Sequence, residues 1–232
     1  MALILSIETS TSICSVALHA SGKLVAYQSM AIARSHAESL LTMINHLLEL
    51  SHHTAKDLQG IAISEGPGSY TGLRIGAATA TGLCYALDIP LIAINTLEAM
   101  VYAVQPFNFY GALCCPMIDA RRMEVYCLIA DSNNTILEAA HPHIVTEHSF
   151  ANWLSQHFML FFGDGAAKCK AILANHKHAI FIEDIYPSAH QIGVLAYAHF
   201  QQNKFVDINL FTPQYLKPFH SSMAAVDRAP LL

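Results

Sequence analysis

The sequence is short of charge, and above all of basic charge. Charged residues make up 12% of the 232 positions, with 12 lysines and arginines against 17 acidic residues and a formal net charge of −5. The longest basic run is the pair Arg121-Arg122. Nucleic-acid binding draws much of its affinity from cations that neutralise phosphates. The composition therefore argues against direct binding of RNA or DNA by this chain alone.

Long apolar runs are also missing, although 53% of the residues are hydrophobic. No window of about 20 residues is free of polar interruption, so no membrane span is expected. The apolar start, Met1 to Ile7, runs into Glu8 and lacks the basic region and cleavage site of a signal peptide. The excess of apolar residues predicts a chain that buries much surface, part of it against another protein. The missing secretion signal predicts a location in the cytoplasm.

Metal and redox motifs are absent as well. The six cysteines include no C-x-x-C pair, which excludes a zinc knuckle and a thioredoxin-type site. Without a secretion signal, reduced thiols are expected. Paired histidine ligands on a helix need a spacing of four, and His36 is followed at that spacing by Leu40. No metal and no intrinsic cofactor are predicted.

What is present is one order of elements, used twice. The first half begins with three strand-like runs at 3–8, 13–19 and 23–29. A helix at 36–50 follows, with Ser35 and Glu38 as a capping box. Then come a strand at 61–64, a helix at 71–87, a strand at 91–94 and a helix that runs from its cap Thr96 to Val104. The pattern restarts around 105–111, with strands at 113–119, 123–130 and 135–139, a helix at 147–157, a strand at 158–162, a helix at 166–175, a strand at 179–182 and a helix at 188–201. This repetition predicts a duplicated α/β unit with lobes 1–105 and 106–232.

The helix at 36–50 carries more apolar surface than one core contact needs. Its apolar positions form two stripes: Ala37, Leu41, Ile44 and Leu48 on one, and Leu40, Met43, Leu47 and Leu50 on the other. Together they cover about half the circumference, more than the usual core-facing stripe. Either one stripe faces the core and the other a partner, or the helix lies deep between two layers.

The helix at 71–87 has a ridge of small side chains. Gly72, Gly76, Ala80 and Cys84 recur every four residues, which lets another helix approach closely. An interior glycine costs about 1 kcal/mol of helix stability relative to alanine, so packing or function must offset that cost.

The residues leading into this helix, 66–76, are the strongest candidate for chemistry. Gly66, Gly68 and Gly72 precede or open the helix and could present backbone N–H groups to an anion, or form a plain strand-to-helix turn. The Walker A pattern G-x-x-x-x-G-K-[ST] does not occur in this segment. The pattern G-x-G-x-x-G is incomplete, because Thr71 stands at its third glycine position. Metal-dependent nucleotide chemistry also needs acidic groups, for which Glu8 and Asp164 are the candidates. With no further acid in a matching loop, a complete ATPase site is not expected.

Several segments together resemble one family. They are Ile7-Glu-Thr-Ser10, Ser35-His36 with Leu40-Leu41, Glu65-Gly-Pro-Gly-Ser-Tyr-Thr-Gly-Leu-Arg-Ile-Gly76, Ala86-Leu-Asp-Ile-Pro90, Ile118-Asp-Ala-Arg-Arg-Met-Glu-Val-Tyr126, Gly163-Asp-Gly165 and Pro213-Gln-Tyr-Leu-Lys217. In this order they are similar to the TsaB (YeaZ) family, also called glycoprotease-like, which bacteria require for threonylcarbamoyladenosine modification of tRNA. Lys217 stands where the family commonly has an arginine. The lysine keeps the positive charge but lacks the forked geometry of the guanidinium group.

The resemblance implies a fold and a role. The fold is the two-lobed actin-like (ASKHA, ribonuclease H-like) α/β fold with duplicated mixed sheets flanked by helices. The role is a non-catalytic subunit that binds and supports its paralogue TsaD, a transferase, with TsaE joining as an ATPase and tRNA contacted only indirectly. Members pair through first-lobe helices, with TsaD or as homodimers. The alternative from the fold is an ATPase or phosphotransferase using Glu8, Asp164 and the 66–76 turn.

The resemblance also implies two sets of residues and no catalytic or metal-binding one. The partner interface is expected at His36, Leu40, Met43, Leu47, Gly72, Arg74, Gly76, Ala80 and Cys84. A vestigial nucleotide site is expected at Glu8, Thr9, Ser10, Gly163, Asp164 and Gly165, with nucleotide bound only at a partner interface. In TsaD two histidines of the equivalent helix bind a metal, whereas this sequence has Leu40 after His36. Leu40→Glu or Gly76→Leu is expected to abolish pairing and leave the monomer folded.

Overall fold

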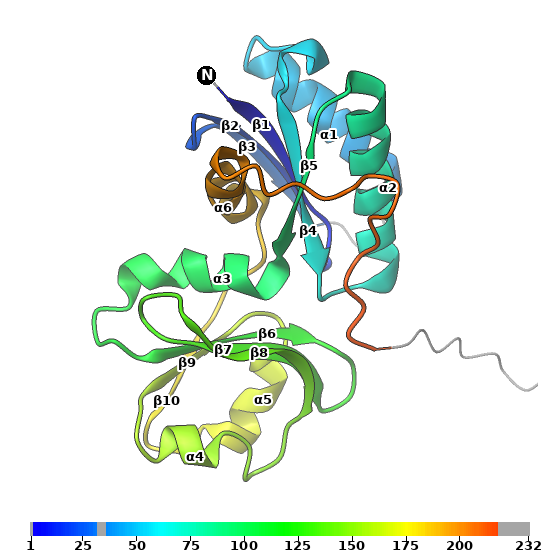
Figure 1. Cartoon of the computed structure of the whole chain (residues 1–232). Coiled ribbons are helices and arrows are strands. Elements are labelled where there is room, and N and C mark those ends of the chain that lie inside the picture. The colour runs from blue at the N-terminus through cyan, green and yellow to red at the C-terminus, as the bar shows by residue number, and fades with distance from the viewer. Residues whose placement is uncertain (1, 32–35, 218–232) are drawn as a thin grey trace, which may run out of the picture.

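The two halves of the chain build two five-stranded sheets with the same strand order, as seen in a computed structural model that describes residues 2–31 and 36–217 (Figure 1). The first sheet has the order β3-β2-β1-β4-β5: β1 (Leu3–Glu8), β2 (Cys14–Ala20), β3 (Lys23–Met30), β4 (Gly60–Gly66) and β5 (Leu91–Asn95). The second has the order β8-β7-β6-β9-β10: β6 (Leu113–Asp119), β7 (Glu124–Ala130), β8 (Ile136–Ile144), β9 (Met159–Phe162) and β10 (Ala179–Ile182). In each sheet an antiparallel meander is extended by two parallel strands. The predicted duplication and actin-like fold are confirmed.

Helices cover both faces of each sheet. They are α1 (His36–Leu50), α2 (Tyr70–Leu87), α3 (Thr96–Val104), α4 (Ala151–Leu154), α5 (Ala166–Leu173) and α6 (Ala189–Gln201), with the short 3₁₀ turns η1 (Ala55–Asp57) and η2 (Gln105–Phe107). In the part of the chain that the structure describes, no helix combines the length and apolar character needed to cross a membrane.

Side-chain caps set the starts of α2 and α3. Ser69 Oγ accepts a hydrogen bond from Gly72 N at 3.3 Å, which satisfies a donor that the first turn leaves open. At α3 the cap is Asn95, whose Oδ1 accepts from Leu97 N at 2.9 Å, so the prediction of Thr96 as the cap was wrong by one residue. The predicted cap Ser35 lies outside the described residues.

The last helix of each half packs on the sheet of the other half. α6 covers the face of the first sheet opposite α1 and α2, with Ile192 and Ala196 against Ile4 and Ala62. α3 covers one face of the second sheet, and α3 and α6 lie side by side between the sheets (Figure 1). We define the first lobe as the first sheet with α1, α2 and α6, and the second lobe as the second sheet with α3, α4 and α5. Two helices, α3 and α6, therefore each lie on the sheet built by the other half of the chain.

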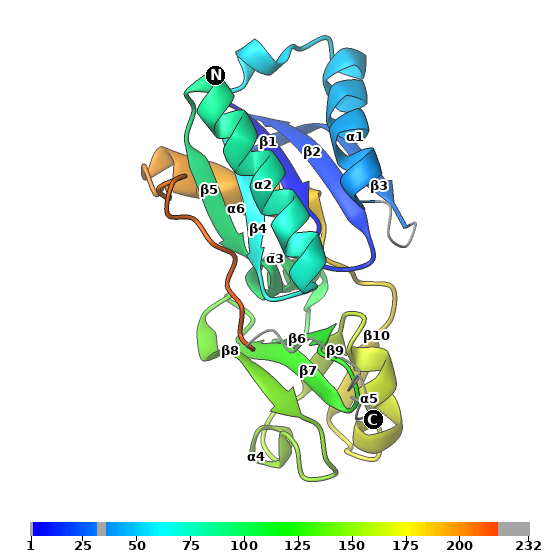
Figure 2. The same cartoon turned by 90° about the vertical axis from the view of Figure 1, so that its right-hand side faces the viewer.

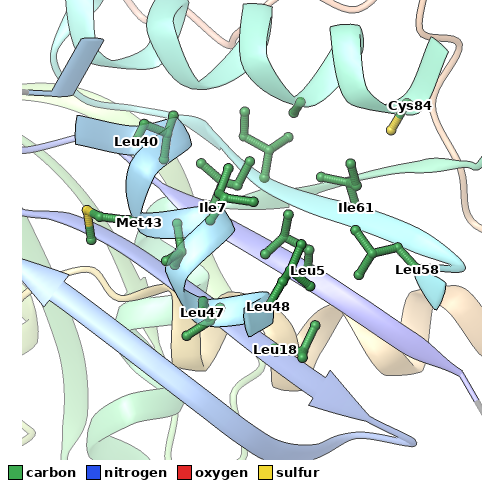
Figure 3. Packing of buried hydrophobic residues seen from close by; sticks show 14 of the residues in the cluster. Leu5, Ile7, Leu18, Leu40, Met43, Leu47, Leu48, Leu58, Ile61 and Cys84 are labelled. Carbon is green, nitrogen blue, oxygen red and sulfur yellow. The ribbon is translucent and has the colours of Figure 1, made fainter. Parts of the chain in front are cut away.

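The core of the first lobe takes both apolar stripes of α1. Leu40, Met43 and Leu47 are at most 3% exposed, and Ile44 and Leu48 from the other stripe are buried with them (Figure 3). The exposed apolar residues of α1 are Ala37, Leu41 (54%) and Leu50 (66%). The expectation that the Leu40 stripe stays free for a partner was wrong, because Leu40, Met43 and Leu47 pack in the core of the first lobe together with Ile44 and Leu48.

After α6 the chain continues along the first lobe and reaches the second lobe at Lys217, the last described residue. Val206 N donates to Leu91 O at 3.0 Å, and Gln214 N donates to Glu65 O at 2.6 Å. The segment then reaches Lys217, which pairs with Glu124 of β7 in the second lobe. We call residues 202–217 the strap; Figures 1 and 2 show it running along the first lobe towards the second.

Candidate functional site

A cleft of about 680 Å³ lies between the turns that follow β1 and β6, which are equivalent positions of the two duplicated units. The first lobe contributes residues 10–12 and 67–71 to its wall. The second lobe contributes 118–122, Glu124, Tyr126 and Asp164, and the strap adds 214–217. The cleft thus gathers segments that are far apart in the sequence and includes most of the motifs that carry the resemblance.

Glu8 and Thr9 lie beneath the cleft rather than in its wall. The Glu8 carboxylate is fully buried and accepts a hydrogen bond from Ser10 N at 2.6 Å. Burial raises the pKa of the Glu8 carboxyl, and the bonds from Ser10 oppose that rise. Thr9 is also fully buried, against α2. Neither residue belongs to the lining of the cleft, so that part of the expected nucleotide site lies beneath it.

The other predicted members of the nucleotide site fall into two groups, residues that line the cleft and glycines that shape the backbone beside it. Ser10 and Asp164 line the cleft. Gly163 and Gly165 serve the backbone, because a Cβ on Gly163 would lie 2.3 Å from Met117 O, and one on Gly165 would lie 2.9 Å from Ile118 C. The two glycines let the loop pass close to β6 and so bring Asp164 to the cleft.

The carboxylates of the cleft wall are already engaged. Asp119 Oδ1 accepts from Lys168 Nζ and, at 2.7 Å, from Arg121 N, while Glu124 Oε2 accepts from Lys217 Nζ. Asp164 Oδ1 accepts from Asp119 N at 3.0 Å, and burial raises the pKa of Asp164. A divalent cation would have to displace lysine ammonium groups from these acids. Within residues 2–31 and 36–217, no group of three or more His, Cys, Asp and Glu side chains is placed to hold a metal ion.

The free positive charge of the cleft comes from the β6–β7 hairpin. Arg121 and Arg122 are exposed, line the cleft and have left-handed backbones, with φ of 71° and 52°. Neither forms an ion pair with a carboxylate of the described residues. Sequence reasoning singled out this pair as the longest basic run but did not place it at a site.

A tyrosine pair joins the strap to α2 at the rim. The rings of Tyr70 and Tyr215 lie 4.7 Å apart between centroids, and the Arg74 guanidinium carbon lies 4.9 Å from the Tyr70 centroid, a cation–π distance. Burial raises the pKa of Tyr215, and Arg74 opposes that rise. The sequence left the role of Arg74 open; the structure shows it over Tyr70.

The nine residues predicted for a partner interface are mostly internal. Seven belong to the core of the first lobe or pack directly on its strands: Leu40, Met43, Leu47, Gly72, Gly76, Ala80 and Cys84. His36 is buried too, with Nε2 2.9 Å from Thr11 O, whereas Arg74 is exposed. The expectation that these side chains form a free surface was wrong, except for Arg74. The outer faces of the same helices carry Leu41, Ala78, Gly82 and Tyr85 instead.

Comparisons with known proteins agree with the motifs and the fold. Residues 30–225 match the family model described as TsaD: tRNA N6-adenosine threonylcarbamoyltransferase. The chain is 34% identical over 151 residues to the tRNA threonylcarbamoyladenosine biosynthesis protein TsaB of Bacillus subtilis, a match covering 65% of this chain and 64% of that protein. It is 38% identical over 124 residues to TsaB of Escherichia coli, covering 53% and 52%. The matches thus span between about half and two thirds of these relatives' own length.

The structure of YeaZ from Pseudomonas aeruginosa superposes with a TM-score of 0.79 at 26% identity, covering 93% of this chain and all of that one. Strand order, cleft motifs, family model and superposition all agree. The chain therefore belongs to the TsaB (YeaZ) family, within the wider group that the TsaD family model describes.

Proposed function

We propose that this chain is a non-catalytic subunit of tRNA threonylcarbamoyladenosine biosynthesis that binds and supports a TsaD-type transferase in the cytoplasm. The names of its relatives support the pathway. The observation that supports the non-catalytic role is the state of the candidate acids: Glu8 is buried beneath the cleft, and Asp119 and Glu124 in its wall form ion pairs with lysines. A TsaE-type ATPase would join through the complex, and tRNA would be contacted only indirectly.

The competing function, an ATPase or phosphotransferase, needs a carboxylate that holds a metal and orients a water. Glu8 and Asp164 were its candidates. Glu8 is fully buried and is not part of the cleft lining, and Asp164 Oδ1 already accepts a hydrogen bond from Asp119 N. The acids of the cleft wall are thus each engaged by a lysine or a backbone N–H group.

The outer faces of α1 and α2 form the docking surface that we propose. Tyr85 is 79% exposed and Leu41 is 54% exposed. A Cβ on Gly82 would meet nothing within 4 Å, so a partner helix can approach closely there. The two helices lie on the same face of the first sheet (Figure 2). Exposed aromatic and aliphatic anchors beside small residues are typical of interface centres. The same surface would serve a homodimer of the isolated chain.

The variants Leu41→Glu and Gly82→Arg test this surface. Both change exposed positions, so circular dichroism should show a folded protein. We expect each to weaken co-purification with the TsaD-type paralogue of the same organism at least about tenfold, as loss of an interface anchor does. Ile144→Glu is the matched control, because Ile144 lies on the edge strand β8 of the second lobe and is 68% exposed. This variant should bind normally. Normal binding by both first-lobe variants would refute the docking surface.

The non-catalytic role is tested by the purified chain with Mg-ATP and no partner. We expect no turnover above the background rate. Steady ATP hydrolysis that disappears in Glu8→Gln would instead establish the enzyme. Light scattering of the same sample gives its mass and separates a monomer from a homodimer.

A further inference from the structure

Three cysteines and a histidine gather inside the second lobe, outside the lining of the cleft. Cys115 on β6, Cys127 on β7 and Cys169 on α5 are fully buried in one hydrophobic core. His141 on β8 lies next to Cys127, with its Nε2 3.9 Å from the Cys127 Sγ. We call these four residues the thiol cluster. The partner-subunit role uses none of them.

The second sheet places Cys115 and Cys127 on the same face. Met117 of β6 pairs with Cys127 of β7, and Cys115 stands two residues before Met117, so the two cysteines are diagonal neighbours. Their side chains are hydrogen-bonded to each other. Cys169 enters the same core from α5, but its Sγ donates to Gly165 O at 3.2 Å. Cys115 is therefore the thiol placed to react with Cys127.

The imidazole of His141 is placed to take the proton of the Cys127 thiol. Its Nδ1 lies 2.9 Å from Ala139 O, and because a carbonyl oxygen only accepts, Nδ1 carries a proton. Nε2 is then the acceptor that faces the thiol. Transfer of the thiol proton to Nε2 gives a thiolate beside an imidazolium. Glu138 Oε1 lies 3.3 Å from the same Nε2 and stabilises the imidazolium.

This environment distinguishes Cys127 from the thiols elsewhere in the chain. The hydrogen bond with Cys115 and the contact with His141 lower the pKa of Cys127, against the effect of burial. The contact with Cys127 in turn raises the pKa of His141. Burial instead raises the pKa of the three cysteines outside the thiol cluster, Cys14, Cys84 and Cys114. Because the thiolate is the reactive form of cysteine, Cys127 is the nucleophile among them.

The edge of the sheet gives solvent a way to the thiol cluster. β8 ends the strand order of the second sheet, and the His141 side chain is 30% exposed beside the buried Cys127. The pairing of β7 with β8 shifts register between Cys127 and Ile129, and Pro142, next to His141, has no N–H to donate. A weakened ladder at an edge opens locally without unfolding of the whole lobe. Such an opening admits a molecule as small as hydrogen peroxide.

We propose that Cys127 is a site of oxidation by hydroperoxides and that Cys115 converts the product into a disulfide. The Cys127 thiolate attacks one peroxide oxygen and the O–O bond breaks, which leaves a sulfenic acid and a hydroxide that takes the proton of His141. The Cys115 sulfur then attacks the sulfenic sulfur, the S–O bond breaks, and the departing hydroxide takes the Cys115 proton. Two thiols are oxidised to one disulfide, and one hydrogen peroxide is reduced to two waters. Because the thiol cluster lies apart from α1 and α2, this proposal and the docking surface can each fail alone.

Treatment of the folded native chain with hydrogen peroxide, followed by alkylation and peptide mass spectrometry, tests the site. We expect the disulfide between Cys115 and Cys127 to form at least tenfold faster than Cys14 is oxidised. Cys14 is the internal control, because it and Cys127 are both 0% exposed. Cys115→Ala should leave a sulfenic acid on Cys127 that dimedone traps.

The role of the imidazole is tested by His141→Gln, which should slow the oxidation of Cys127 at least tenfold. His143→Gln makes the same change two residues along β8, beyond the thiol cluster, and should stay within twofold of the native rate. Circular dichroism shows that both variants are folded.

Three results would overturn the proposal. Oxidation of Cys127 no faster than that of Cys14 would mean that the fold gives Cys127 no special reactivity. Equal rates for the native chain and His141→Gln would remove the imidazole from the site. A native chain that forms no disulfide, or one that joins Cys127 to Cys169, would remove Cys115 from the second step.

Discussion

A Cβ on Gly72 would lie 2.1 Å from the carbonyl oxygen of Thr9, so α2 rests directly on the turn that follows β1. Gly76, one helical turn later, has the same relation to the Thr9 side chain, with Oγ1 at 2.4 Å from the position of a Cβ. The small-residue ridge therefore holds α2 against its own sheet and fixes one wall of the cleft. It is not the surface that meets another helix.

This contact predicts opposite effects for two glycines of the same helix. Gly72→Ala places a methyl group against backbone that cannot move aside, and we expect a loss of roughly 1–3 kcal/mol in the free energy of unfolding. Gly82→Ala should gain roughly 0.5–1 kcal/mol, because its Cβ meets nothing and alanine favours the helix. Urea denaturation of the two variants measures both. A Gly72→Ala protein as stable as Gly82→Ala would contradict the close packing of α2.

Neighbouring leucines of α1 give a second contrast. Leu40 is 1% exposed and Leu41 is 54% exposed. Leu40→Ala should cost roughly 2–5 kcal/mol of stability through a cavity in the core, whereas Leu41→Ala should change it by less than about 0.5 kcal/mol. Leu40→Glu and Gly76→Leu, first expected to leave the monomer folded, should instead unfold it. Thermal melts compare the stabilities of these variants. Equal melting temperatures for the two alanine variants would show that α1 does not bury Leu40.

Much of the fold could be predicted because periodicity is local. The bounds of α1 and β6 agree with the sequence to the residue, and the meander of each half was recognisable. The helix expected at 147–157 shrinks to α4 because Phe150, with φ of 61°, breaks the helical path. Which sheet receives α3 and α6 was not predictable, since apolar periodicity shows that a helix is covered but not by what.

The site was predictable only in part for the same reason. Motifs brought Ser10 and Asp164 forward as members of a nucleotide site; both line the cleft, and the binding of a nucleotide there stays a prediction. The pairs that decide its chemistry join distant positions, Lys217 with Glu124 and Lys168 with Asp119. The burial of Glu8 could not be predicted from the sequence either, because a carboxylate at the end of a strand is usually exposed.

A buried histidine makes the stability of the first lobe depend on pH. His19 of β2 is fully buried under α6, where a Cβ on Gly193 would lie 2.1 Å from its Nδ1. Its ring stacks on His190 with centroids 5.8 Å apart. Burial, and then the neighbouring His190, lowers the pKa of His19 from 6.5 to about 4.

In the unfolded chain His19 takes up a proton near its ordinary pKa, while in the folded chain it stays neutral until about pH 4. The unfolded state therefore binds more protons between these values, and stability falls as the pH falls. We expect a loss of at most about 2 kcal/mol from this residue between about pH 7 and pH 4.5. The raised pKa values of Glu65, Glu98 and Asp164 act in the opposite direction, so the effect must be isolated by substitution.

His19→Phe keeps an aromatic ring under α6 and removes the titration. Urea unfolding of the native chain and of this variant, at both pH values, gives the difference in pH dependence that belongs to His19. We expect the variant to lose about 1–2 kcal/mol less than the native chain on acidification. His46→Phe, at an exposed position of α1, is the control and should follow the native chain. If His19→Phe and the native chain lose the same stability, His19 is protonated in the folded protein, and its burial under α6 does not hold.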